Sequence, residues 1–134
     1  MPIVERSVLP IRSQEDIVRV RQATRSSAIA MGFSLVDQTK LVTAASELAR
    51  NTLDYGGGGE VELTNVNDAA RCGVRLIFSD AGPGIPDIEQ ALRDGFTSGS
   101  GLGLGLGGAR RLSNEFAIES KPGQGTRITI ARWR

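Results

Sequence analysis

The sequence contains no histidine, only two lysines and a single cysteine. Without histidine the chain can supply no imidazole base, no histidine metal ligand and no phosphohistidine. Neither Lys40 nor Lys121 follows a glycine, as the lysine of the common phosphate-loop motif does. Cys72 alone excludes an internal disulfide and a cysteine-rich zinc site. Any chemistry on a bound ligand must therefore rest on carboxylates, amides, arginines and backbone groups.

The charge balance and the aromatic content exclude further classes of protein. The 134 residues carry a net charge of +1, which is too small to indicate a nucleic-acid partner. Aromatic residues make up only 4%, so platforms for stacking single strands are not expected. No apolar run approaches the roughly 20 residues that span a bilayer, and the N-terminus lacks the pattern of a secretion signal. We expect one cytoplasmic domain, residues 1–134, with no nucleic-acid or membrane partner.

Hydrophobic periodicity and turn residues predict strands and helices in the order βααββααββ. We expect strands at 3–11, 60–66, 72–79, 115–120 and 126–133. We expect helices from Ser13 to Gly32, from Ser34 to Gly56, at 86–93 and at about 104–114, with a loop at 94–103. Strands and helices in this order favour an α+β, two-layer sandwich, in which helices cover one face of a mixed, mostly antiparallel sheet.

Two polar residues of the second expected helix are spaced to lie on one face. Glu47 and Asn51 are four residues apart, beside the apolar stripe that faces the core. The amide oxygen of Asn51 can coordinate Mg²⁺, a hard cation that binds few protein ligands. Glu47 can orient a water or a substrate hydroxyl. Taken alone the pair also fits a solvated helix face, because glutamate is a good helix former, although asparagine is less favoured there.

An aspartate followed by two glycines ends an apolar strand. Asp80 comes directly after residues 74–79, and Gly82 and Gly84 follow it. An aspartate at a strand end can accept a hydrogen bond from an exocyclic amine. Glycines beside it let the backbone approach a flat ring, since no Cβ intrudes. The same residues are usual in a strand-to-helix turn, so this segment alone leaves both interpretations open.

The segment Gly99–Gly108 alternates glycine with leucine over most of its length. Glycines at the opening of a helix expose backbone N–H groups, and the helix dipole favours anions there. The spacing Gly103-x-Gly105-x-x-Gly108 matches the dinucleotide-binding fingerprint. That motif must follow a strand, whereas Phe96–Ser100 precedes it here. We therefore reject a dinucleotide site and interpret the segment as a loop suited to an anion.

Three arginines of the first expected helix, Arg19, Arg21 and Arg25, lie within two turns of one another. Surface charge is the simplest interpretation of such a group. A docking patch for an acidic partner is the alternative.

Three elements, in this order along the chain, resemble the ATP-binding fold shared by gyrase B, Hsp90-type chaperones, histidine kinases and MutL. This is the GHKL superfamily, with its Bergerat fold. Glu47-Leu-Ala-Arg-Asn51 looks like the N box of that superfamily. Asp80-Ala-Gly-Pro-Gly84 looks like its first glycine box, and Gly101-Leu-Gly-Leu-Gly-Leu106 like its second. The resemblance covers nearly the whole chain, and the set is more specific than any one part.

The resemblance also implies roles for individual residues. Asn51 would bind Mg²⁺, Asp80 would read the adenine amino group, and Thr126 would support the base near Asp80. Gly82 and Gly84 would border the base, and residues 95–106 would form a lid over ATP. The lid residues expected at the nucleotide are Gly101, Leu102, Gly103, Leu104, Gly105 and Leu106.

Within the superfamily the chain most resembles the small serine/threonine kinases of bacterial partner-switching modules. Among these it looks closest to the stressosome switch kinases of the RsbT type, through Ser46–Asn51, Asp94–Phe96 and Arg111–Phe116. Anti-sigma factor kinases commonly carry a histidine shortly after the N-box asparagine. This chain has Asp54 and Tyr55 there, which puts sigma-factor binding in doubt.

The resemblance implies a kinase that uses ATP and Mg²⁺ to phosphorylate a serine or threonine of a STAS-domain antagonist or scaffold protein. Glu47 is the candidate base because no histidine is available. Once released, the kinase would activate a PP2C-type phosphatase in the general stress response. Two alternatives stay open: an anti-sigma factor that sequesters a sigma subunit and phosphorylates its anti-anti-sigma factor, and an ATPase module without a protein acceptor. The sequence leaves open the acceptor residue, the upstream signal and homodimer formation.

Overall fold

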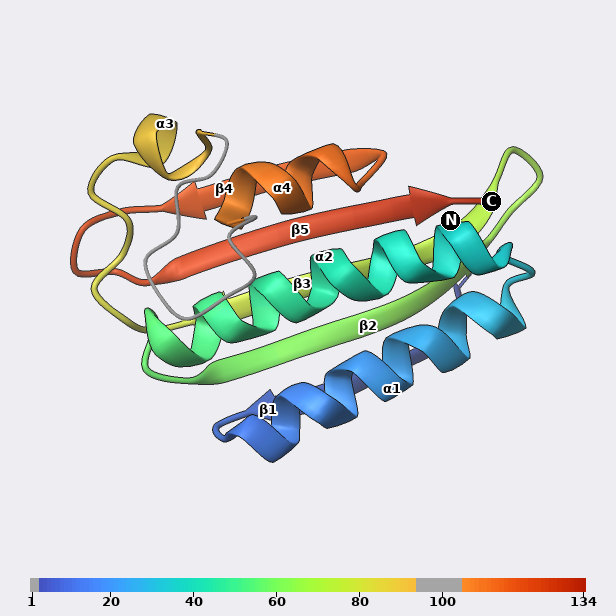
Figure 1. Cartoon of the computed structure of the whole chain (residues 1–134), viewed down its shortest axis with the longest axis horizontal. Coiled ribbons are helices and arrows are strands. Elements are labelled where there is room, and N and C mark those ends of the chain that lie inside the picture. Colours follow the sequence, from blue (N-terminus) through green and yellow to red (C-terminus); the bar gives the residue numbers. More distant parts are fainter. Residues whose placement is uncertain (1–2, 94–104) are drawn as a thin grey trace.

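A five-stranded sheet and a layer of helices make up the structure (Figure 1). The structure, a computed structural model, describes residues 3–93 and 105–134. In chain order the elements are β1 (Ile3–Ile11), α1 (Gln14–Ala30), α2 (Leu35–Asp54), β2 (Gly59–Asn67), β3 (Cys72–Asp80), α3 (Ile88–Ala91), α4 (Gly105–Arg111), β4 (Glu115–Ser120) and β5 (Thr126–Trp133). The order confirms the α+β sandwich predicted from the sequence.

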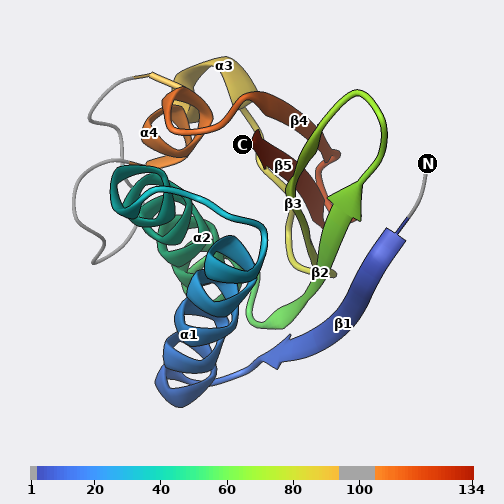
Figure 2. The same cartoon turned by 90° about the vertical axis from the view of Figure 1, so that its right-hand side faces the viewer.

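Every strand pairing in the described residues is antiparallel, and the strand order is β1-β2-β3-β5-β4. This confirms the mostly antiparallel sheet that we expected. Viewed from the side, the helices cover one face of the sheet (Figure 2). In the register of the central strands, Asp80 of β3 lies opposite Gly59 of β2 and Thr126 of β5. Three strand ends therefore meet at one end of the molecule.

Apolar side chains fill the space between the two layers. The strands contribute residues such as Leu76 and Ile130, and α2 contributes Leu41 and Leu48, all fully buried. Burying each side chain of this size stabilises the fold by about 1.5–3 kcal/mol. α2 contacts α1, α4 and the sheet, so it buries more than one stripe of residues, whereas much of α1 stays exposed. No helix in the described part of the chain is long and apolar enough to cross a membrane.

Each long helix begins at a serine, as predicted. The hydroxyls of Ser13 and Ser34 accept hydrogen bonds from the backbone N–H groups of Asp16 and Asp37, both at 3.2 Å. These caps satisfy N–H groups that have no partner within the helix. Asp16 adds a second cap, because its carboxylate accepts the backbone N–H of Arg12 at 2.9 Å. That hydrogen bond, more than any other contact, holds the pKa of Asp16 below its ordinary value.

Arg132 of β5 connects the start of α2 to the end of α4. Its Nη1 donates to the carbonyl oxygen of Leu112 and its Nη2 to Asp37, both at 2.8 Å. The Arg132 side chain is largely buried, so water screens this ion pair less than a surface pair. The hydrogen bond from Arg132 also lowers the pKa of Asp37. The contact fixes α4 relative to α2.

Two short helices precede and follow a segment that lies outside the described residues. α3 and α4 are each shorter than the predicted helices at 86–93 and 104–114. The predicted loop at 94–103 lies outside the described residues. Gly107 of α4 packs so closely on the carbonyl oxygen of Leu92 that a Cβ atom would overlap it. A glycine at this position therefore lets α4 pack against the end of α3.

Candidate active site

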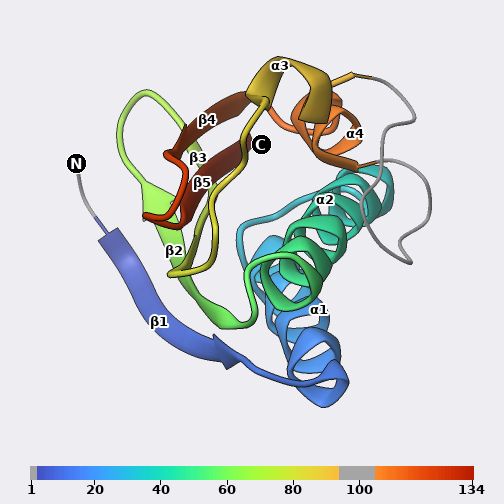
Figure 3. The same ribbon diagram turned by 90° about the vertical axis from the view of Figure 1, so that its left-hand side faces the viewer.

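Asp80 is the last residue of β3, at the end of the molecule that faces the viewer in Figure 3, and the backbone of three other segments packs close to it. A Cβ atom added to Gly56 would overlap the Asp80 carboxyl group. A Cβ atom on Gly125 would overlap the Asp80 carbonyl oxygen, and one on Gly82 would lie 2.6 Å from the carbonyl oxygen of Gly56. Three glycines thus let the end of α2, the loop after β3 and the turn before β5 meet around one carboxylate.

The Asp80 carboxylate is half-buried and partly used within its own loop. Its Oδ1 accepts a hydrogen bond from the backbone N–H of Gly82 at 2.9 Å. An ionised carboxylate has about four acceptor positions, so this bond leaves capacity for a ligand. The hydrogen bond from Gly82 orients the carboxylate, and an N–H donor of a ligand can bind to the remaining acceptor positions of its oxygens.

Asn51 lies one turn before the end of α2, and the backbone of Gly56 connects that turn to Asp80. The backbone carbonyl of Asn51 accepts hydrogen bonds from the N–H groups of Tyr55 at 2.9 Å and Gly56 at 3.2 Å. Gly56 is also the residue that packs against the Asp80 carboxyl group. The last turn of α2 therefore brings Asn51, which is half-buried, to the same end of the molecule as Asp80.

Glu47 is buried one turn before Asn51 on the same helix, with a relative exposure of 7%. The two residues are about 6 Å apart along the helix axis, given a rise of 1.5 Å per residue. Burying a carboxylate is costly unless the protein compensates it. A solvated helix face, the simpler interpretation of the sequence, is therefore excluded for Glu47.

A pair of hydroxyl groups supports the strand ends beside Asp80. Thr126 is buried, and its Oγ1 lies 2.8 Å from the Oγ of Ser120. Ser120 accepts a hydrogen bond from the N–H of Ile85 at 2.8 Å and donates one to the carbonyl oxygen of Gly125 at 3.1 Å. Sequence reasoning selected Thr126 but missed Ser120. No motif marks Ser120, because only the register of the β4–β5 hairpin brings it here.

Close packing within the protein also requires glycine at position 84, after Asp80. Gly84 has a positive φ of 79°, and its Cα lies against the backbone carbonyl of Lys121. Pro83 accepts a hydrogen bond from the N–H of Gly123 at 2.7 Å. The loop after β3 is thereby attached to the turn between β4 and β5.

The structure describes only part of the predicted lid. Gly105 opens α4 with a φ of 61°, and Leu106 is buried in the core. The rest of the predicted lid, residues 95–104, lies outside the described residues; it includes Gly101, Leu102, Gly103 and Leu104, which were expected at the nucleotide. In the described part, Asp80 of β3 lies opposite Thr126 of β5, and the turn that follows Asn51 at the end of α2 packs against Asp80.

Known proteins share both the sequence and the fold. Residues 36–134 match the family described as histidine kinase-, DNA gyrase B-, and HSP90-like ATPase. Serine/threonine-protein kinase RsbT of Bacillus subtilis is 43% identical over 129 residues, which cover 96% of this chain and 97% of that protein. Adaptive-response sensory kinase SasA of Prochlorococcus marinus is 30% identical over 112 residues, which are 72% of this chain but only 29% of that longer kinase.

Two solved structures have the same fold at lower sequence identity. The first contains the RsbU and RsbW domains of a Mycobacterium tuberculosis protein; its TM-score is 0.65 at 20% identity, covering 99% of this chain and 33% of that one. The second is the SiaB–SiaC complex of Pseudomonas aeruginosa, with a TM-score of 0.57 at 14% identity, covering 98% of this chain and 91% of that one. At these identities the likeness concerns the fold alone.

The chain belongs to the family of histidine kinase-, DNA gyrase B- and HSP90-like ATPases, and its match along the full length of a known kinase makes it an ATP-dependent serine/threonine-protein kinase. The resemblance inferred from the N box and the two glycine boxes is thereby confirmed.

We expect Ser120→Ala to destabilise the fold by about 1–3 kcal/mol, because the N–H of Ile85 would lose its hydroxyl partner. Urea denaturation of both proteins measures the change. Ser113→Ala is the matched control, since the Ser113 hydroxyl only bonds the carbonyl oxygen of Ala109 one turn earlier in the chain. Equal effects of the two substitutions would contradict a specific role for Ser120.

Proposed function

We propose that the protein is a cytoplasmic kinase that transfers the γ-phosphate of ATP to a serine or threonine of a STAS-domain antagonist protein. One observation carries the proposal. The register sets Asp80 of β3 opposite Thr126 of β5, and the turn that follows Asn51 of α2 packs against Asp80, in a chain that is 43% identical to a serine/threonine kinase along its length. The kinase, its acceptor protein and the partner that the released kinase binds would together form a bacterial partner-switching system.

Asp80 reads the adenine base in this proposal. Its carboxylate accepts a hydrogen bond from the exocyclic amine, and Thr126 supports the base from the neighbouring strand end. Gly82 and Gly84 border the base. The close packing of Gly56 and Gly82 supports this role, because backbone without side chains leaves a flat wall beside the carboxylate.

Asn51 holds Mg²⁺ together with the phosphates of ATP. The described residues contain no cluster of three or more acidic, cysteine or histidine side chains that could hold a metal by themselves. One amide oxygen with phosphate oxygens and waters nevertheless suits Mg²⁺, which binds proteins through few ligands. The bound ion would supply positive charge against the phosphates. The lid, from Gly101 to Leu106, would add backbone N–H groups.

Glu47 acts as the base in phosphoryl transfer. The hydroxyl oxygen of the acceptor bonds to the γ-phosphorus, the bond from that phosphorus to the β–γ bridging oxygen breaks, and ADP leaves with this oxygen. The hydroxyl proton passes to the Glu47 carboxylate. Such transfers depend mainly on positioning and on neutralising charge, and Glu47 lies one turn from Asn51 on the same face of α2.

Release follows from the charge that the reaction adds to the acceptor protein. A phosphorylated side chain carries about −1.5 to −2 charges at neutral pH. It would stand beside the buried carboxylate of Glu47, so like-charge repulsion weakens the complex. The released kinase then binds and activates a PP2C-type phosphatase of the general stress response.

Asp80→Asn and Gly56→Ala should each weaken ATP binding at least tenfold. The first substitution removes the acceptor charge, and the second puts a methyl group where the Asp80 carboxyl lies. Isothermal titration with ATP measures the affinity. Gly57→Ala is the control, because Gly57 has a φ of 76° and no neighbour within 4 Å. It should cost about 1 kcal/mol of stability and leave ATP affinity unchanged; unaltered binding by Asp80→Asn would refute the adenine assignment.

Glu47→Gln should lower kcat for phosphorylation about 100-fold or more while ATP affinity stays within threefold, since general bases contribute about 10²–10⁴-fold. Radiolabelled ATP with candidate STAS-domain proteins measures transfer. A variant that keeps full activity would remove this role from Glu47. If the wild type labels no STAS protein but co-purifies with a sigma factor, the anti-sigma function replaces the one proposed.

Phosphorylation should dissociate the kinase from its acceptor. Size-exclusion chromatography of the mixture with a non-hydrolysable ATP analogue is expected to show one complex, and with ATP two separate proteins. Mass spectrometry confirms that the acceptor is fully modified. A complex that persists after complete phosphorylation would contradict release by charge.

A further inference from the structure

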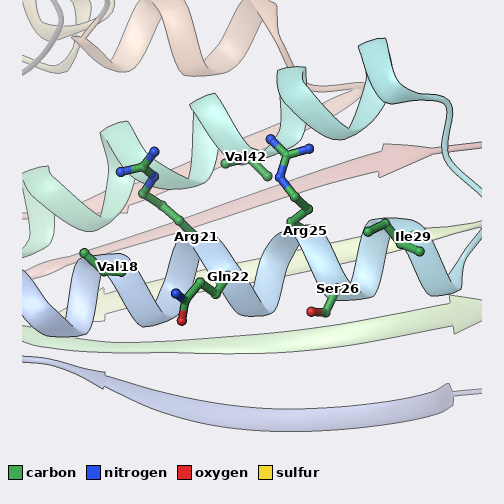
Figure 4. A pocket seen from close by; sticks show the side chains of 7 residues that line it. All are labelled: Val18, Arg21, Gln22, Arg25, Ser26, Ile29 and Val42. Carbon is green, nitrogen blue, oxygen red and sulfur yellow. The ribbon is translucent and has the colours of Figure 1, made fainter.

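The outer face of α1 forms a groove with α2, away from the strand ends that surround Asp80. Six residues of α1, between Val18 and Ile29, line it together with Val42 of α2, and it has a volume of about 460 Å³ (Figure 4). In the close view, the guanidinium groups of Arg21 and Arg25 extend from α1 toward α2. The candidate active site uses none of these residues.

Apolar side chains stand open to solvent along this groove. Val18 is 47% exposed and Ile29 is 58% exposed. Val18, Gln22, Arg25 and Ile29 follow one another at i, i+4, i+7 and i+11, which is the spacing of a single helix face. From Val18 to Ile29 this face is about 16 Å long at 1.5 Å per residue. Its length and spacing match about three turns of another helix.

The arginines of α1 differ in how their charge is compensated. Arg19 forms an ion pair with Asp16 at 2.7 Å. Arg25 donates to the neutral amide oxygen of Gln38 at 3.2 Å. Within residues 3–93 and 105–134, neither Arg21 nor Arg25 takes part in an ion pair. Because like charges four residues apart destabilise a helix slightly, this pair of cations is not explained by the stability of α1.

We propose that the groove docks an acidic, amphipathic helix of the protein substrate. Two carboxylates of that helix, one turn apart, pair with Arg21 and Arg25. Its apolar residues cover Val18, Ile29 and Val42. The charge complementarity selects an acidic partner, and the exposed apolar side chains provide the contact area.

A second copy of this chain does not fit the groove. In a two-fold symmetric contact the same patch faces itself. The centre of the groove would then bring Arg21 and Arg25 of one copy against the same arginines of the other. This repulsion favours a different protein with acidic residues.

The position of the groove along α2 indicates that the partner is the substrate, an identification that rests on the proposed function. Val42 precedes Glu47 by five residues, or about 7.5 Å along the helix axis. A protein held at the groove is therefore within about one and a half turns of the candidate base along α2, and its segments that reach around the helix, by about 140°, meet Glu47. Such docking raises the effective concentration of the acceptor hydroxyl at the active site.

Steady-state kinetics with the STAS-domain substrate test the proposal. Arg21→Glu/Arg25→Glu should raise KM for the protein substrate at least tenfold and leave KM for ATP unchanged. Val18→Ser/Ile29→Ser should raise the same KM several-fold. Lys40→Glu/Arg134→Glu, exposed residues outside the groove, changes the net charge equally and should have no effect. An unchanged KM in the arginine variant, or an equal rise in the control, would overturn the docking site.

A binding experiment without nucleotide separates this inference from the proposed function. The probe is a 14-residue helical peptide with two glutamates four residues apart between leucines, followed by NMR chemical shifts. We expect shifts along α1, binding weakened at least tenfold by Arg21→Glu/Arg25→Glu, and no binding of the lysine analogue of the peptide. Asp80→Asn should bind the peptide normally.

The outcomes of the two experiments are distinguishable. If the peptide binds at the groove but no STAS-domain protein is phosphorylated, the docking site stands and the proposed function falls. If the peptide causes no shifts at millimolar concentration, or binds the wild type and the arginine variant equally, the docking site is refuted. Circular dichroism melts of each variant confirm that the fold is kept.

Discussion

The close approach of the segment that follows α2 to the C-terminal end of β3 determines the geometry of the candidate site. At Gly56 the backbone of α2's C-terminal turn lies where any side chain would overlap the Asp80 carboxyl group. Gly59 packs on the carbonyl oxygen of Ser79 in the same way, and Gly125 on that of Asp80. Contacts made by glycine backbone, to the Asp80 carboxyl group and to the carbonyl oxygens of β3, therefore set the distance from the helix that carries Asn51 to the strand that ends at Asp80.

The same helix is also held at its other end. Arg132 joins Asp37, in the first turn of α2, to the carbonyl oxygen of Leu112 after α4. Packed backbone thus fixes one end of α2, and a shielded ion pair fixes the other. A site without histidine depends on such rigidity, because its carboxylates and amides must be held in position to bind the nucleotide and to accept a proton from the substrate.

The sequence predicted the order of the elements because local signals agreed at each boundary. Ser13 and Ser34 have the chemistry of helix caps, and apolar residues alternate along the strands. The burial of Glu47 could not be predicted, since periodicity reveals one apolar stripe but not that α2 is enclosed by α1, α4 and the sheet. The register of the strands could not be predicted from the sequence either. Because the register alone brings Ser120 next to Thr126, sequence reasoning missed Ser120.

The sequence shows where the glycines are but not which residues they contact in the fold. From the sequence, Gly56 indicates only the end of the second helix. In the structure, Gly56 packs against the Asp80 carboxyl group and so shapes the site. From the sequence alone, Arg19, Arg21 and Arg25 form one group of surface charges. Only the structure separates Arg19, which neutralises Asp16, from the two arginines of the groove.

The helical layer carries arginines at the groove and a carboxylate at Glu47, and these opposite charges would allow the kinase both to bind and to release its protein substrate. In the proposed mechanism, the cationic groove at Arg21 and Arg25 would attract an acidic partner, and the carboxylate of Glu47 would repel that partner once it carries a phosphate. Since α2 is anchored at both ends, docking at Val42 can align the acceptor without reshaping the site. The state of the partner, and not a conformational change of the kinase, would then decide whether the complex persists.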